Sequence, residues 1–429
     1  MTVILVSTKS PFLRGYIMKH SSNTFKLILF TALLGAFAGL VVWCFLKAVS
    51  ICTGLIWEKL PFATGFTYAP LIICILGGLI VGIIHRSFGD YPEELQVVME
   101  KIQKDKHYDY HPIAAMLICA FFPLVCGASV GPEAGLTGII AALCYWVGDN
   151  VTFAKSNTEM ISEIGEAVTL GQLFSSPLFG ILAVEEKDDT ASDDTLKQMS
   201  RGSKLLFYGI STASGFLIAN VLNSFFGAPM GGFPAFSGVS MERNDLLSAL
   251  IYIPSGLLLY GFFELSEHLF SGLSNKIPVI IKETLCGALI GIMVIIFPLS
   301  MFSGEEEMGE MLTSFTSYTP LFLLSICLIK IIMTTFCIRL GMKGGHFFPL
   351  IFSCTLLGLA LALMIFAGDP APHAGFAAAT VTATTLGAQL KKPITASLLL
   401  LLCFPLNILF WIFLCAAIGC KVSERFKAA

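Results

Sequence analysis

Long uncharged apolar runs recur along the whole chain, and they constrain its fold more than any other feature of the sequence. Each is long enough to cross a bilayer as a helix, which takes about 17–25 residues. Charged residues make up only 13% of the chain, about half of the roughly 25% usual in a soluble domain. The sequence therefore predicts an all-α polytopic membrane protein, because a helix pairs its backbone groups within itself. The runs are Leu27–Leu46, Pro61–Ile84, Pro112–Pro132, Leu205–Met241, Leu246–Phe263, Thr284–Gly304, Met311–Ile329, Pro370–Leu390 and Pro393–Cys420.

Charges at the two ends of the chain indicate its orientation. The arm before Leu27 holds four basic residues and no acidic one, and the nine residues after Cys420 hold three basic residues and one acidic one. Because cytoplasmic flanks are enriched in Lys and Arg, we expect both termini in the cytoplasm and the protein in the cell inner (plasma) membrane.

We expect no cofactor, no metal and no nucleic-acid partner.

A weak internal repeat divides the chain into two halves. The segment from Gly39 to Gly82 resembles the segment from Gly256 to Gly291, with offsets of 217 and 209 residues at its ends. We expect an arm at 1–23, a first membrane repeat at 24–226, a linker at 227–243, a second repeat at 244–420 and a tail at 421–429. Chance similarity between glycine-rich segments is the alternative. A similar offset carries Glu133 onto Phe347, and interrupted segments at corresponding positions indicate a transport site near the membrane midplane.

Three glycine–proline breaks could present backbone amides to an anion. They are Gly89-Asp-Tyr-Pro92, Gly131-Pro-Glu-Ala-Gly135 and Gly344-Gly-His-Phe-Phe-Pro349, and each precedes a helix-like run. The N-terminus of a helix has unpaired N–H groups and a partial positive charge, so it attracts anions. Glu133 is a lone carboxylate between two uncharged runs, which costs roughly 2.5–3.5 kcal/mol and indicates a functional residue. A carboxylate and an anion would compete for the same amides.

The order of these motifs resembles the CLC family of chloride channels and chloride/proton antiporters. Residues 127–135 are similar to the family segment GxSxGREGP, and residues 326–349 to its lysine-bearing helix and GGxFxP motif. Residues 171–186 resemble FNAPLAGxLFxxEE, and Gly89–Pro92 stands where GSGIP would. The similarity covers about residues 25–420. It implies a homodimer with one pore in each subunit, built from two inverted repeats of tilted and re-entrant helices.

The resemblance also assigns roles to single residues. Glu133 matches the gating glutamate, and His346 and Phe347 match residues whose amides hold the central anion. The remaining anion-binding candidates are Gly131, beside the gate, Gly89, at the position of a coordinating serine, and Asn407, near the position of the pore tyrosine. The inner proton-relay glutamate falls on Lys187, with Glu186 and Glu185 beside it.

Departures from the family pattern leave the ion and the coupling open. Pro132 replaces the arginine before the gate, Gly89 offers no hydroxyl, and Asp90 places a carboxylate beside the expected anion path. We predict transmembrane transport of an anion, with chloride as the first candidate and fluoride or another anion as the alternative. Glu133 would gate either a proton-coupled antiporter or a channel. We expect membrane lipid to surround the protein.

Two other classes of protein use parts of the same sequence. Gly127-Ala-Ser-Val-Gly131 fits the G-x-S-x-G of serine hydrolases, so an intramembrane serine protease using Ser129 is an alternative, provided that a histidine base lies nearby. A carrier for a small organic or cationic substrate is favoured only by Asp90 and by the acidic stretches near residues 185–194 and 305–310, which we expect to be solvated loops. Lys330 is expected to join helices rather than bind a ligand.

Overall fold

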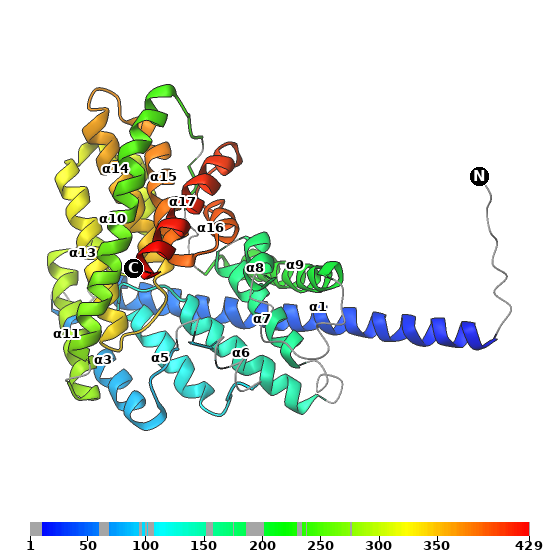
Figure 1. The fold of residues 1–429 in the computed structure, drawn as a ribbon. Coiled ribbons are helices and arrows are strands. Elements are labelled where there is room, and N and C mark those ends of the chain that lie inside the picture. Colours follow the sequence, from blue (N-terminus) through cyan, green and yellow to red (C-terminus); the bar gives the residue numbers. More distant parts are fainter. Residues whose placement is uncertain are drawn as a thin grey trace, which may run out of the picture.

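The structure is a computed structural model that describes the chain from Pro11 to Ala428, except residues 60–67, 94–96, 99–100, 102–106, 152–157, 175, 186–200, 230–233, 237 and 275–276 (Figure 1). The described part is helical, with one isolated β-bridge. The helices up to residue 226 are α1 (Pro11–Thr53), which continues into the π-helical η1 (Gly54–Lys59), then α3 (Ala69–Phe88), α5 (Ile113–Val125), α6 (Glu133–Asn150), α7 (Thr158–Leu173), α8 (Pro177–Glu185) and α9 (Arg201–Phe226).

The second half begins with α10 and adds shorter helical pieces between its longer helices. The described residues between α9 and α10 form no helix. The elements of this half are α10 (Arg243–Ser274), α11 (Val279–Ile296), η2 (Pro298–Ser300), α12 (Glu305–Ser314), η3 (Phe315–Ser317), α13 (Pro320–Arg339), α14 (Phe347–Ile365), α15 (Ala371–Leu390), α16 (Pro393–Leu400), η4 (Leu406–Ile408) and α17 (Leu409–Ala428).

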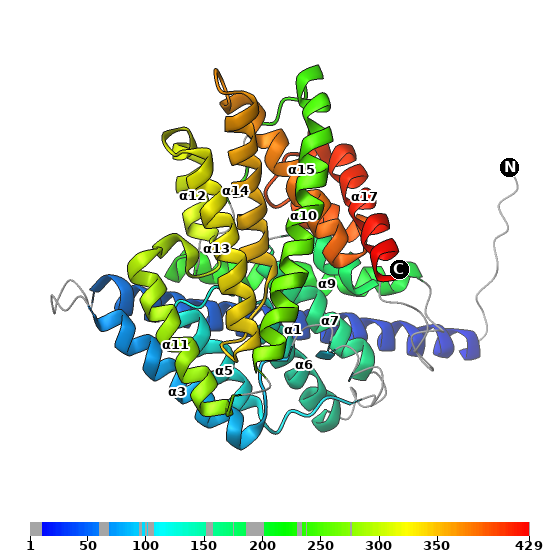
Figure 2. The same cartoon turned by 60° about the vertical axis from the view of Figure 1, so that its left-hand side comes forward.

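Within the described ranges, eight helices are long and apolar enough to cross a membrane. They are α1, α3, α9, α10, α11, α13, α14 and α17, so the prediction of an all-α polytopic membrane protein is confirmed. The N-terminal end of α1 projects beyond the rest of the molecule in both views (Figures 1 and 2).

The expected single span at Met311–Ile329 is wrong. Helix α12 ends at Ser314 and α13 begins at Pro320. The break has a local cause: the Thr319 hydroxyl accepts the Phe322 N–H at 3.2 Å as an N-cap, and proline at the first helical position favours a new start. The apolar run Met311–Ile329 therefore covers parts of two helices. The longer run Pro393–Cys420 likewise divides into α16 and α17.

Glycines bring helices from the two halves into close contact. Helices α3 and α11 lie side by side in both views (Figures 1 and 2). A Cβ placed on Gly78 would lie 2.2 Å from the Glu283 carbonyl oxygen, and one on Gly287 would lie 2.1 Å from the Cys74 carbonyl oxygen. Only glycine permits this approach, which is the usual role of small residues in membrane helix packing. The G-x-x-x-G patterns of the repeat therefore form its central packing contact.

The most deeply buried helices, α14 and α15, form the core of the second half. Ala374–Ala388 of α15 is buried along its whole length. Four threonines lie in this stretch, and their hydroxyls donate back to carbonyls of α15 at 2.7–2.9 Å. Helix interiors commonly satisfy threonine in this way. A polar sequence thus packs inside the protein without an unpaired hydroxyl at these positions.

Candidate functional site

The two strongest breaks of the sequence meet in space and pair with each other. The Gly131 N–H donates to the Gly345 carbonyl oxygen and the Gly345 N–H donates to the Gly131 carbonyl oxygen, each at 2.7 Å. A Cβ on Gly345 would lie 1.7 Å from the carboxyl carbon of Glu133, so any other residue here would displace the Glu133 side chain. This two-residue bridge holds the N-termini of α6 and α14, from opposite halves, around one point.

Glu133 occupies that point. It is the first residue of α6 and only 4% of it is exposed. Its Oε1 atom accepts the backbone N–H of Phe347, the first residue of α14, at 2.9 Å. Amides at a helix N-terminus attract negative charge. The Glu133 carboxylate therefore occupies a helix N-terminus of the kind that attracts negative charge.

One cavity is lined by Glu133 itself and a second by its chain neighbour Pro132. One, of about 340 Å³, is lined by Glu133 together with His346, Phe347, Gln389 and Lys391, among others. The other, of about 300 Å³, is lined by the neighbours of the site, Pro132 and Phe348, and by Glu305. Either volume exceeds the share of one water molecule in the liquid, about 30 Å³, several-fold. Glu133 and Phe347 line the first space, and their chain neighbours Pro132 and Phe348 line the second.

Side chains of helix α13 form hydrogen bonds with the segments that flank the site. The Ser129 hydroxyl, two residues before the break at Gly131, forms a hydrogen bond of 3.0 Å with the Thr334 hydroxyl. Lys330, one turn earlier, is fully buried and donates to the carbonyl oxygens of Met301 and of Phe302, the latter at 2.8 Å. Lys330 thus fixes the connection between α11 and α12, and the expectation that it joins elements of the fold agrees with these contacts.

The other predicted site residues have different positions. Gly131 uses its amide in the bridge, so it positions the helix starts. The Gly89 amide donates to the His85 carbonyl oxygen at 3.1 Å, at the exposed end of α3. Asn407 is exposed, and its amide donates to the Val239 carbonyl oxygen at 2.9 Å. The structure therefore brings neither Gly89 nor Asn407 into the cavity that Glu133 lines.

Most of the proposed proton relay lies outside the described residues. Glu185 is the last residue of α8, and Glu186 and Lys187 lie outside the described residues. His346 begins the α14 segment as its N-cap, and its ring Nε2 lies 3.3 Å from Nε2 of Gln389 in the wall of the larger cavity.

Two buried carboxylates did not emerge from the sequence as site residues. The acidic stretch at 305–310 is not a solvated loop: it forms α12, and its first residue, Glu305, is 7% exposed and faces the smaller cavity. The preceding Gly304, in the left-handed region, starts the helix. Glu283 of α11 is fully buried against His85 of α3. For Glu283, the signal available in the sequence was a single carboxylate within an otherwise mostly apolar helix.

The fold and the paired breaks define an α-helical membrane protein in which helix N-termini from the two halves of the chain meet around Glu133. Residues 77–424 match the sequence profile of the voltage-gated chloride channel family, and the chain belongs to this family. It is 25% identical over 368 residues to YfeO of Shigella boydii serotype 4, which is named only provisionally as an ion-transport protein. The match covers 82% of this chain and 81% of YfeO.

Solved structures share the fold. A CLC-type fluoride/proton antiporter superposes with a TM-score of 0.70 at 16% identity, covering 94% of this chain and 96% of the other. A slow cyanobacterial chloride/proton antiporter superposes with a TM-score of 0.75 at 17% identity, covering 93% and 94%. These similarities establish the CLC architecture expected from the motifs.

Proposed function

We propose that this protein carries a small anion across the membrane and that Glu133 is its gate. The observation that carries the proposal is the 2.9 Å hydrogen bond from the Phe347 amide to Glu133 Oε1. A carboxylate of one half occupies the amide end of a helix from the other half, so an anion must displace it to pass. Family membership and the antiporter names of the solved relatives support the same transport class.

The gate works by competition for one set of amides. When it is ionised, the Glu133 carboxylate holds the Phe347 N–H and blocks the passage between the cavities. When it is protonated, its attraction for the amide falls, because hydrogen bonds to a charged acceptor are about twice as strong as neutral ones. The side chain can then move into the larger cavity, which it already lines, and an anion can take its place.

Proton coupling follows if the proton on Glu133 moves on to the other side. We propose a chloride/proton exchange, with fluoride as the alternative anion, since the solved relatives include an antiporter for each. Glu186 or Glu185 stays our proposed relay from the resemblance. An anion held by backbone amides rather than by a full cationic charge is bound weakly enough to leave again.

The remaining proposals concern the surroundings of the pore. We propose a homodimer in the inner (plasma) membrane with both termini in the cytoplasm. Large apolar side chains are exposed on several helices, for example Leu178 of α8 at 59%, Leu217 of α9 at 67% and Phe410 of α17 at 79%. Lipid and a second copy of the chain are the natural cover for such side chains in a membrane.

The serine-hydrolase alternative gains no support from the contacts of Ser129. Its hydroxyl pairs with Thr334, whereas a nucleophilic serine needs a histidine base within hydrogen-bond reach. The carrier for a small organic or cationic substrate loses one of its two supports, because Asp90 already pairs with Lys343 at 2.7 Å.

The test is ion flux in proteoliposomes that contain the purified protein. Efflux of chloride, fluoride and nitrate is measured with and without a pH gradient, together with proton movement. We expect anion flux that drives proton movement in the opposite direction. Absence of flux for all three anions, in protein shown to be folded and inserted, would overturn the proposal. Anion flux without proton movement would show that the protein is an anion channel rather than a proton-coupled antiporter.

A further inference from the structure

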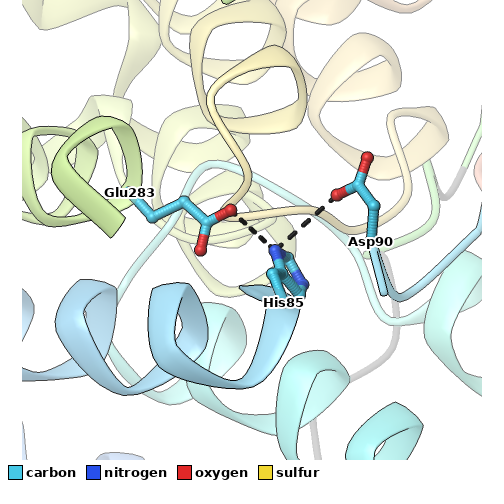
Figure 3. A group of neighbouring side chains, drawn as sticks. All are labelled: His85, Asp90 and Glu283. Carbon is cyan, nitrogen blue, oxygen red and sulfur yellow. Dashed lines mark hydrogen bonds and ion pairs between the residues drawn. The ribbon is translucent and has the colours of Figure 1, made fainter. Parts of the chain in front are cut away.

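A second buried carboxylate pairs with a histidine between the two halves of the chain. His85, near the end of α3, and Glu283, on α11, point toward each other, and Asp90 lies beside them on the following loop (Figure 3). His85 Nδ1 is 2.7 Å from Glu283 Oε1 and 3.6 Å from Asp90 Oδ1. The side chains of His85 and Glu283 are 1% and 0% exposed, whereas that of Asp90 is 61% exposed.

The contacts of both ring nitrogens determine where hydrogens must lie. His85 Nε2 is within hydrogen-bond reach of the Tyr91 carbonyl oxygen, which can only accept, so Nε2 carries a hydrogen. Nδ1 and Glu283 Oε1, 2.7 Å apart, then need one further proton between them, since two lone pairs would repel at that distance. The pair therefore holds one proton, shared between an imidazole nitrogen and a carboxylate oxygen.

Among the charged groups that contact one another in this cluster, the charges balance only when this proton is present, since the Lys282 ammonium donates to the Ser274 hydroxyl instead. Asp90 and Glu283 contribute two negative charges, and Lys343, which donates to Asp90 Oδ2 at 2.7 Å, contributes one positive charge. The shared proton supplies the second positive charge. Partial desolvation by its neighbours raises the pKa of Asp90, but the Lys343 ammonium and its hydrogen bond outweigh this effect and hold that pKa below its ordinary value. Asp90 is thus a carboxylate.

A divalent metal fits this cluster less well than a proton does. Three ligand-type groups, on His85, Asp90 and Glu283, lie within 4.8 Å of one another. A divalent ion in place of the proton would, however, leave a net positive charge beside the Lys343 ammonium, and Lys343 already occupies one oxygen of Asp90. An uncompensated charge in a buried setting is costly. The ordinary hydrogen-bond distance of 2.7 Å also agrees with a shared proton.

We infer that His85 and Glu283 form a proton-binding site of this transporter. The proton leaves from Nδ1 toward water beside the exposed Asp90 carboxylate, so that neutral His85 keeps its Nε2 hydrogen and Glu283 becomes a carboxylate. The other titratable groups near the cluster are Lys282, Cys119 and Cys286. Within the described residues, none of these groups donates a hydrogen bond to Glu283, so none compensates for the loss of the proton.

Release of this proton acts on the backbone that leads to the gate. Glu283 packs against Gly341, where a Cβ would lie 2.4 Å from Glu283 Oε1, and Lys343 follows two residues later. The next residues, Gly344–Phe347, form the bridge and the amide at Glu133. Once the proton has left, the two lone pairs repel and the Glu283 side chain must shift along this segment. This coupling rests on the proposed anion transport, but proton binding itself does not.

Infrared difference spectroscopy of the whole protein in lipid tests proton binding without any flux. A pH titration of the wild type is compared with Glu283→Gln, with His85→Gln and with Asp149→Asn. The last is a matched control, since Asp149 pairs with His107 at 3.1 Å on the surface. We expect a carboxyl signal that titrates in the wild type and in Asp149→Asn. The component of this signal that belongs to Glu283 should be lost in Glu283→Gln, while the component of Glu133 remains. The midpoint of the Glu283 component should shift in His85→Gln.

Flux through the same variants then tests the coupling. We expect Glu283→Gln to keep anion flux and to lose much of the proton movement that accompanies it. An infrared titration identical in wild type and Glu283→Gln would overturn the inference, even if anion flux is normal. If the wild type carries no anion but shows the infrared difference, the proposed function fails and the proton site stands. Stoichiometric binding of added Zn²⁺ that both His85→Gln and Glu283→Gln abolish would assign the cluster to a metal instead. Should Glu283→Gln fail to fold, His85→Gln carries the test.

Discussion

Removal of the Glu133 carboxylate should open the site to anions and abolish its dependence on pH. In the structure, Glu133 Oε1 accepts the Phe347 N–H at 2.9 Å. An anion that binds this amide must first displace the carboxylate, so its apparent affinity is lowered by the free energy of that contact. The variant Glu133→Ala leaves the amide and the start of α14 in place without an internal competitor.

The size of the effect follows from the type of hydrogen bond. A hydrogen bond to a charged group contributes about 1.5–3 kcal/mol, and each 1.4 kcal/mol is a factor of about ten in affinity. Glu133→Ala should therefore strengthen anion binding by about 10- to 100-fold at a pH where Glu133 is ionised. In the wild type, protonation removes the competitor, so its flux should rise as the pH falls, while the flux of the variant should stay level.

Calorimetric titration with chloride and fluoride, and proteoliposome flux at several pH values, measure the two effects. Glu306→Ala is the control, since Glu306 is an exposed carboxylate of the nearby α12. Equal anion affinity in Glu133→Ala and in the wild type, or a pH dependence of flux that survives the substitution, would refute the role of Glu133 as gate.

Three further predictions concern the packing and the charges around the site. Gly287→Leu should destabilise the protein by at least the 1–3 kcal/mol of an overpacked contact, seen as a lower thermal midpoint. Gly272→Ala, with no atom within 4 Å of the new Cβ, should not; equal midpoints would contradict the close approach of α3 and α11. Lys330→Met should lower the midpoint and the yield, because two buried carbonyls lose their donor at about 1–3 kcal/mol each; an unchanged midpoint would show that they are otherwise satisfied. Asp90→Asn should lower the midpoint at neutral pH. The pKa of Asp90 is depressed below about 3.8 in the folded state, so its stabilising effect is complete above that pH and is lost as acid takes the pH through the depressed pKa; a constant difference between the two proteins down to low pH would refute this.

Local composition was sufficient for the class of protein and marked Glu133 as a functional residue. The apolar runs require membrane helices because the bilayer offers no partner for free backbone groups. The glycine–proline breaks at Gly131 and Gly344 end those helices by local geometry, and Glu133 is prominent as a lone charge between two of them. The split at Thr319–Pro320 was also readable in principle, since a threonine N-cap followed by proline is a helix-start signal, although the continuous apolar run at Met311–Ile329 concealed it.

Only the tertiary structure decided which partners these residues find. Glu133 meets an amide 214 residues away, and His85 meets a carboxylate 198 residues away. Gly131 has its amide engaged by Gly345, and Gly89 and Asn407, placed at the pore by resemblance, have backbone partners elsewhere. Such contacts depend on how closely helices of the two halves approach, which is set by the fit of Gly78 and Gly287 against facing backbone. The sequence by itself thus determined the membrane helices, their breaks and the costly carboxylate, because these follow from short-range chemistry. The opposing amide, the flanking cavities and the buried proton arose only from packing, because they join residues that the chain itself keeps far apart.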